Sequence, residues 1–195
     1  MSVRVDPGTL LLSAPSLRDP NFMHTVVLMC QHDEDGAFGL VVNRTGETRV
    51  KALFPDHPLL SSLDVPVRQG GPVGRDTLQI LHRVPPRTAP DDETALGGVE
   101  LIDGLWIGGD LEEVARFTGV ADDPDALVRF VVGYAGWGEG QLESEIRIGS
   151  WLPLPATPEL VFSRDDPEAV WREAMSRLGG GGPSLAHLPP DPSWN

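Results

Sequence analysis

The feature that most constrains this chain is a strand, a glycine-rich turn and a short helix that follow one another between residues 127 and 151. The run Leu127–Val132 is apolar and rich in β-branched residues, which predicts a buried strand. Four glycines then fall within eight positions: Gly133, Gly136, Gly138 and Gly140. Leu142 and Ile146 lie on one face of a short helix, which Gly149 is suited to end. The turn therefore joins a strand to a helix through residues that carry no side chain.

Two interpretations of this glycine turn are open. Glycines permit a positive φ and a close approach of backbones, and Trp137 would then fill the core, which is the role we favour. In the other interpretation, backbone N–H groups at the start of the helix attract an anion. No G-x-x-x-x-G-K-[ST] or G-x-G-x-x-G spacing supports this, and Glu139 would repel a phosphate. The candidate ligand-binding residues at this turn are Gly136, Trp137, Gly138 and Gln141.

The charge of the chain limits its partners. Its 195 residues include 29 acidic and 15 basic side chains, which gives a net charge of −14. That balance repels nucleic acids and anionic membranes at long range. The length fits one domain, and the 22 glycines and 19 prolines favour short elements and many turns over a helical bundle.

Nothing in the sequence predicts export, a membrane span or a metal site. No apolar run approaches the roughly 20 residues that cross a bilayer, and the first residues lack the core of a signal peptide. Cys30 is the only cysteine and lies in an apolar run, so we expect a buried, inert thiol and no disulfide. The five histidines show no zinc-binding spacing. We therefore expect a cytoplasmic protein without a metal or a cofactor.

Strands are expected along most of the chain, and helices come late. The expected strands are at residues 8–13, 24–32, 37–43, 67–73, 77–84, 99–102, 105–107, 127–132 and 159–162. The expected helices are at 110–119, 142–148 and 166–178, with a short one at 50–57. The turns Asp33–Gly36 and Asp103–Gly104 predict two antiparallel hairpins. This order indicates a single α+β domain over residues 1–178, a mobile loop at 85–94, and a flexible glycine- and proline-rich tail at 179–195.

Four separated motifs, in this order, resemble the AlgH/YqgE family of bacterial proteins. The motifs are Pro15–Phe22 (with residues 25–28 and His32), Gly36–Asn43, Gly70–Val73, and Gly136–Glu143 (with Gly149–Trp151). The resemblance runs from about Gly8 to Leu178, which is nearly the whole chain. It departs from the family at Gln69, where an aromatic residue is often found, and in the tail after Leu178.

The resemblance implies a fold of bent, bifurcated, mostly antiparallel β-sheets with about three helices packed on them. It implies no assigned chemistry, although some members of the family are named as transcriptional regulators. No DNA-binding motif of this chain supports that role.

Polar residues near the first predicted hairpin form a second candidate site. They are Ser16, Asp19, Asn21, His32 and Asn43. We favour an interpretation in which the first three of them cap turns through hydrogen bonds to the backbone. The alternative is an enzyme of unassigned, hydrolytic class that uses Asp19, His32 and Asn43, provided that they converge. Ser16 lacks the G-x-S-x-G elbow of a serine hydrolase.

Two further stretches bear on binding. Gly70 and Gly71, ahead of Pro72, allow either a close approach to a ligand or a tight turn, and we favour the turn. Seven of the 15 basic residues fall in one Arg-rich region: Arg44, Arg49, Lys51, Arg68, Arg75, Arg83 and Arg87. If the protein binds DNA directly, this region is the candidate surface. The net negative charge of the chain opposes such binding, so we favour an interpretation in which these basic side chains are simply solvated. The sequence thus favours a cytoplasmic binding or regulatory module that acts through a protein partner or a small anionic ligand.

Overall fold

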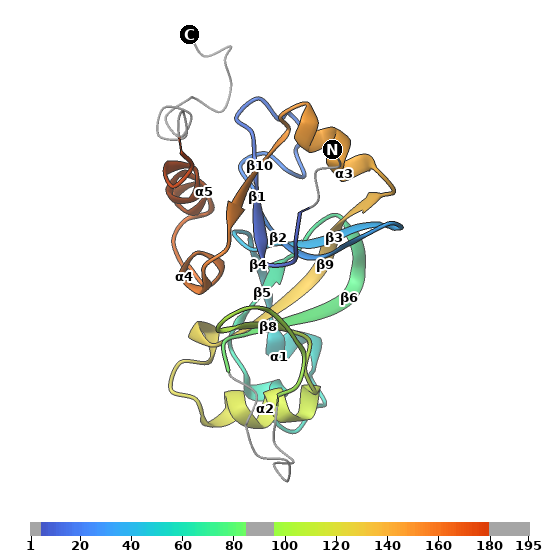
Figure 1. Ribbon diagram of the computed structural model, residues 1–195. Coiled ribbons are helices and arrows are strands. Elements are labelled where there is room, and N and C mark those ends of the chain that lie inside the picture. Colours follow the sequence, from blue (N-terminus) through green and yellow to red (C-terminus); the bar gives the residue numbers. More distant parts are fainter. Residues whose placement is uncertain (1–4, 85–95, 180–195) are drawn as a thin grey trace.

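A computed structural model describes residues 5–84 and 96–179 (Figure 1). Its strands are β1 (Thr9–Ser13), β2 (Val26–Asp33), β3 (Gly36–Val41), β4 (Thr45–Arg49), β5 (Pro66–Gln69), β6 (Val73–His82), β7 (Val99–Ile102), β8 (Leu105–Ile107), β9 (Val128–Gly138) and β10 (Trp151–Pro155). Its helices are α1 (Val50–Leu53), α2 (Leu111–Val120), α3 (Gln141–Arg147), α4 (Pro158–Val161) and α5 (Pro167–Ser176), with 3₁₀ helices η1 (Leu60–Ser62) and η2 (Pro124–Ala126). The predicted loop at 85–94 and the tail from residue 180 lie outside the described residues.

The strands form a mostly antiparallel sheet in the order β10-β1-β2-β3-β9-β6-β8-β7. The β4–β5 pair lies off this path and joins the sheet through β5, which runs parallel to β9. The α+β fold that the sequence predicts is therefore confirmed. The hairpins β2–β3 and β7–β8 are also present, with the predicted polar turns between their strands.

Strand β9 is the element that divides the sheet. Its first part pairs with β6 on one side and with β5 on the other, whereas its last residues pair with β3. Gly70 lies at the fork: its N–H donates to the carbonyl of Val132, and its own carbonyl accepts from the N–H of Val41. A Cβ at Gly70 would lie 2.2 Å from the carbonyl oxygen of Gly133. The backbones approach each other this closely only because Gly70 has no side chain.

The prediction of a glycine-rich turn directly after Val132 is wrong, because most of that segment is strand. Strand β9 continues through Gly133 and Gly136 to Gly138, and only residues 139 and 140 turn before α3. Residues 136–138 pair with β3, so the backbone hydrogen bonds of an extended ladder outweigh the weak strand propensity of glycine. The glycines there allow neighbouring strands to approach closely.

The predicted strand at 159–162 is also wrong, because this segment forms the one-turn helix α4. The side chain of Thr157 accepts a hydrogen bond from the N–H of Leu160 at 3.4 Å, and Pro158 occupies the first helical position. The strand in this part of the chain is β10, which starts at Trp151 and pairs with β1. The sequence analysis assigned no strand there, and it also missed β4.

The three longer predicted helices are present as α2, α3 and α5. Asp110 and Asp166 cap α2 and α5 with their carboxylates, as their sequence positions indicated. The two remaining helices, α1 and α4, are single turns of four residues each. The described chain thus has five α-helices, of which three are longer than one turn.

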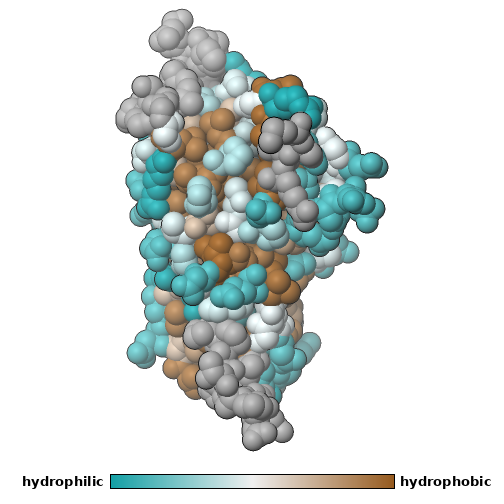
Figure 2. Space-filling view, in the orientation of Figure 1, coloured by the Kyte–Doolittle hydropathy of each residue, from teal (hydrophilic) through white to brown (hydrophobic). Residues whose placement is uncertain are grey.

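Helices cover the two faces and the lower end of the sheet (Figure 1). α4 and α5 pack beside β1 and β2 around Trp171, and α1 and α2 close the lower end around Phe130. α3 covers a third cluster around Trp137 and Trp151. Figure 2 shows hydrophobic residues over the upper sheet near β1 and β10, and hydrophilic residues along both flanks. No helix among the described residues has the length and apolar character to cross a membrane.

Candidate anion pocket

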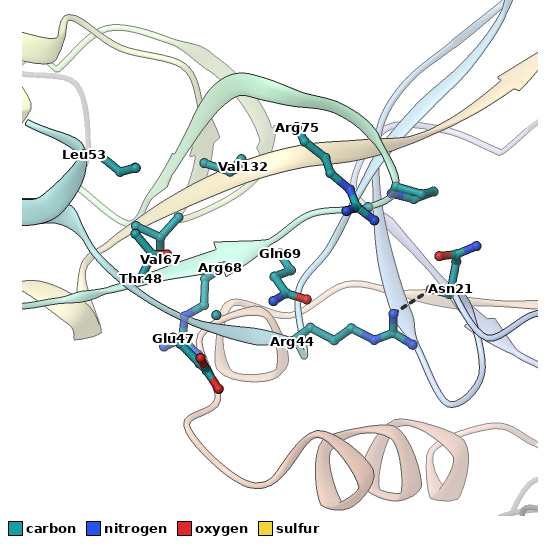
Figure 3. Close-up of a pocket in the computed structure, with 13 residues that line it drawn as sticks. Asn21, Arg44, Glu47, Thr48, Leu53, Val67, Arg68, Gln69, Arg75 and Val132 are labelled. Atoms are coloured by element: carbon teal, nitrogen blue, oxygen red, sulfur yellow. Dashed lines mark hydrogen bonds between the residues drawn. The ribbon is translucent and has the colours of Figure 1, made fainter.

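A cavity of about 450 Å³ opens between β4, β5, the start of β6 and the loop that carries Asn21 (Figure 3). Three arginines from separate segments line it: Arg44, Arg68 and Arg75. We call this cavity the arginine pocket. Its volume lies within the range of small-molecule sites. The pocket is basic in a chain whose net charge is −14.

Arg44 ties the loop before β2 to the pocket. Its guanidinium donates to the backbone carbonyls of Asn21 at 2.7 Å, Met23 at 3.2 Å and Pro20 at 3.4 Å. Burial lowers the pKa of Arg44, and the nearby carboxylate of Asp19 opposes that shift. The group remains a cation at neutral pH. These neutral acceptors fix the direction of the guanidinium without cancelling its charge.

Arg68 is the buried cation of the pocket, with only 6% of its surface exposed. One terminal nitrogen donates to both carboxylate oxygens of Asp125, at 3.0 and 3.1 Å, and the other donates to the hydroxyl of Thr45. The Nε of Arg68 is buried and has no hydrogen-bond partner in the described chain. Leaving such a donor unpaired costs about 1–3 kcal/mol. This atom has almost no accessible surface, so it is closed off from the cavity and does not itself offer a contact to a ligand.

Burial and ion pairing act in opposite directions on this pair. Desolvation lowers the pKa of Arg68, and the charge of Asp125 opposes the shift. Desolvation raises the pKa of Asp125, and the charges of Arg68 and Arg164 oppose it. The pair is stable because each ion compensates the other in a partly dry site.

The two ends of the arginine pocket differ in character. Figure 3 shows Arg44 and Arg75 at the same end as Asn21, and Leu53, Val67 and Val132 at the opposite end. Arg75 is exposed and has no hydrogen bond or ion pair to the described residues. An exposed cation lies at one end, and three apolar side chains lie at the other beside the Arg68 and Glu47 side chains, so the two ends of a ligand would meet different surroundings.

Some of the residues singled out from the sequence lie at this pocket, and others do not. Asn21 and Gly71 line it, and Gly70 lies next to it at the fork of the sheet. The carboxylate of Asp19 accepts from the N–H of Asn21 at 2.8 Å, as in a capped turn. Ser16 is exposed in the same loop and does not line the pocket.

The residues of the enzyme alternative do not converge. Asn43 bonds to the backbone of Val26, at the start of β2, whereas His32 lies near the end of that strand. Six residues of extended strand separate these positions by roughly 20 Å. The ring of His32 bonds instead to Val5 and, at 3.2 Å, to Glu143. Asp19, His32 and Asn43 therefore serve three separate structural contacts.

The segment 136–141 packs against residues from three other parts of the chain. We call this cluster the aromatic corner, and its members are Phe22, Trp137, Gln141, Glu145 and Trp151. Both indole N–H groups donate to one carboxylate oxygen of Glu145, at 2.9 and 2.7 Å. Gln141 donates to the other oxygen at 2.8 Å and accepts from the N–H of Gly138 at 3.1 Å. Each polar group here is used internally, so the packing interpretation of Trp137 fits the geometry.

Most of the pocket lining could not be predicted from the sequence. Arg44, Arg68 and Arg75 stood out only as members of a basic region, and no binding role was predicted for Leu53, Val67 or Val132. No local signal marks Arg68, because it is followed by Gln69 at the polar end of the short strand Pro66–Gln69. Arg87 of the same region lies outside the described residues.

No group of three metal-ligating side chains was found in residues 5–84 and 96–179. The expectation of no metal and no cofactor remains a prediction. Cys30 is partly buried, and burial raises the pKa of its thiol far above the ordinary range. The thiolate required for nucleophilic chemistry is therefore disfavoured.

The fold and the pocket together define an α+β protein with a branched, mostly antiparallel sheet and a basic cavity at its fork. Residues 10–182 match the family described as DUF179, AlgH-like, and the chain belongs to this family. The resemblance seen in its motifs is thereby confirmed.

Relatives and solved structures agree with this assignment. A UPF0301 protein of Chlorobaculum tepidum is 38% identical over 97% of this chain and 95% of its own length. A UPF0301 protein of Paracoccus denitrificans is 38% identical over 88% of this chain and 89% of its own. The solution structure of AlgH from Pseudomonas aeruginosa has a TM-score of 0.64 at 30% identity, covering 96% of this chain and 98% of that one. A crystal structure of a Corynebacterium diphtheriae protein has a TM-score of 0.72 at 22% identity, covering 96% and 95%, and it supports the fold alone.

Proposed function

We propose that this protein is a cytoplasmic binding module that takes a small organic anion in the arginine pocket. A regulatory role would follow from the effect of that ligand on a protein partner. The observation that carries the proposal is that one cavity is lined by three arginines, Arg44, Arg68 and Arg75. Arg44 donates only to backbone carbonyls, and Arg75 is exposed at the same end of the cavity, so both keep a positive charge that a ligand can reach.

Anion binding also fits the electrostatics. Guanidinium groups bind carboxylates and phosphates through charge-assisted hydrogen bonds. Positive groups at a concave site in an otherwise acidic protein attract a small anion and exclude a long polyanion, which the remaining acidic surface repels. For this reason we do not favour direct DNA binding through the Arg-rich region, although DNA remains one arm of the test.

The test is a direct binding measurement by calorimetry and by ligand-dependent thermal shift. The panel contains acetate, inorganic phosphate, longer organic carboxylates, a mononucleotide and a short DNA duplex. We expect saturable binding of organic anions and no binding of DNA at physiological salt. Arg75→Ala removes one exposed cation of the pocket and should weaken binding about tenfold, the value of one charge-assisted hydrogen bond.

The matched control is Arg147→Ala, which removes the same charge from the exposed end of α3. Arg147 does not line the pocket. Equal weakening by both variants would indicate a nonspecific charge effect and would contradict the proposal. Failure of every organic anion to bind at millimolar concentration would contradict it as well.

A further inference from the structure

The arginine pocket is amphipathic along its length, and this property restricts the chemistry of its ligand. Leu53, Val67 and Val132 lie at the end away from Arg44 and Arg75 (Figure 3). Leu53 is 40% exposed although it is a large hydrophobic residue. An exposed leucine at the mouth of a cavity becomes buried when an apolar group fills the space beside it. A small inorganic anion would fill only the basic end.

The number of charges that line the pocket is small. Glu47 lies on the Arg68 side of the cavity and offsets one of the three arginines. Asp125 binds Arg68 directly at 3.0 Å and offsets most of its charge, although it also lies 3.4 Å from Arg164 and 3.8 Å from Arg129. Asp19 acts on Arg44 from an exposed loop, where solvent screens it. About one positive charge therefore remains without a fixed partner, and a ligand with one negative charge matches it best.

We infer that the ligand is a singly charged anion, of the carboxylate type, carried on an aliphatic or aromatic body. This inference rests on the proposed function. The acid group faces Arg44 and Arg75. The apolar body lies on Leu53, Val67 and Val132. Glu47 disfavours a second negative charge midway along the ligand.

The experiment is a chain-length series of straight carboxylates, from acetate through butyrate and hexanoate to octanoate, titrated into the full chain by calorimetry. Each methylene that becomes buried contributes about a fourfold gain in affinity. We expect affinity to rise steadily with length until the apolar end is filled. Octyl phosphate at pH 8, where it is a dianion, should bind no more tightly than octanoate.

The apolar end is tested with Leu53→Asn. This variant should weaken octanoate roughly tenfold and leave acetate unchanged, because acetate does not reach that end. Leu59→Asn is the matched control, since Leu59 is 37% exposed nearby in the chain and does not line the pocket. Circular dichroism verifies that both variants fold, and Leu53→Ala replaces Leu53→Asn if the latter does not.

The outcomes separate this inference from the proposed function. Short and long carboxylates that bind equally, with both sensitive to Arg75→Ala, would overturn the inference and leave the proposed function intact. An octanoate affinity that Leu53→Asn does not change would also overturn the inference. Octyl phosphate that binds tenfold more tightly than octanoate would overturn the assignment of a single charge. If no anion binds, the proposed function itself fails.

Discussion

Two regions of this molecule carry glycine-rich motifs, and they use them in opposite ways. In the aromatic corner, Glu145 accepts both indole N–H groups and Gln141 bonds to the end of β9, so every polar side chain is paired. At the arginine pocket, Gly70 and Gly71 bring three strands together, and the neighbouring Arg68 keeps an unpaired buried donor. The first region is closed core packing, whereas the second leaves the charges of Arg44 and Arg75 open to a ligand.

Glycine content alone does not locate a site. At Gly138 a Cβ would meet no atom within 4 Å, whereas at Gly71 it would lie 2.2 Å from backbone atoms of Tyr134. Of these two glycines, the one at the pocket is the more constrained. What separates a site from a core is whether the polar groups beside the glycines have partners within the protein.

The largest loss of stability is expected from Gly71→Ala. The residue has a φ of +151°, and an added Cβ would overlap backbone that cannot move aside. We expect the free energy of unfolding to fall by about 4 kcal/mol, the sum of a strained φ and an overpacked contact. Urea denaturation measures this change, with Gly138→Ala as the matched control. If both variants lost the same stability, the contrast between the two regions would disappear.

The next effect is expected from Arg68→Ala, which leaves Asp125 without its two-oxygen partner in a site where the carboxylate is 16% exposed. Arg164 and Arg129 remain 3.4 and 3.8 Å from Asp125, so the free energy of unfolding should fall by about 2 kcal/mol, less than for a buried charge left wholly unpaired. Arg75→Ala should change it by less than about 0.5 kcal/mol, because that side chain is exposed. Equal losses would mean that Arg75 is structural and not available to a ligand.

Glu145→Ala tests whether the hydrogen bonds of the aromatic corner stabilise the fold. The change leaves the indole N–H groups of Trp137 and Trp151 without their acceptor, and it should destabilise the protein by about 2 kcal/mol. Anion affinity at the arginine pocket should remain that of the unaltered chain. Glu139→Ala, on the exposed turn nearby, is the control and should cost less than about 0.5 kcal/mol. A loss of anion binding in Glu145→Ala would show that the two regions are coupled.

The smallest change in stability is expected from protonation of His82 at low pH. This residue is wholly buried near the end of β6. Burial lowers the pKa of His82, and the carbonyls of Gly97 and Val84, each 3.1 Å from a ring nitrogen, oppose this only in part. The unfolded chain therefore binds a proton more strongly than the folded one, so stability should decrease as the pH falls below about 6.5. The melting temperature measured from pH 7.5 to 5.5 should fall less in His82→Gln. An identical pH profile for the two proteins would contradict this assignment.

Much of the fold could be predicted because its signals are local. The turns Asp33–Gly36 and Asp103–Gly104 specify two hairpins, and the carboxylates of Asp110 and Asp166 mark the starts of two helices. These residues act on backbone within a few positions of themselves, so the chain alone determines them. The separated motifs were likewise sufficient to identify the family.

The tertiary structure decided the rest, because the decisive contacts join distant residues. Strand β9 runs on through its glycines only because β3 supplies a ladder for it, about a hundred positions earlier in the chain. The parallel pairing of β5 with β9 places Arg68 beside Asp125, and Arg44 reaches three carbonyls of a loop that precedes it by more than 20 residues. No local pattern encodes the convergence of three arginines on one cavity, since each arginine alone is compatible with a solvated face. The sequence determined which elements form, and the branching of the sheet decided which of their side chains meet.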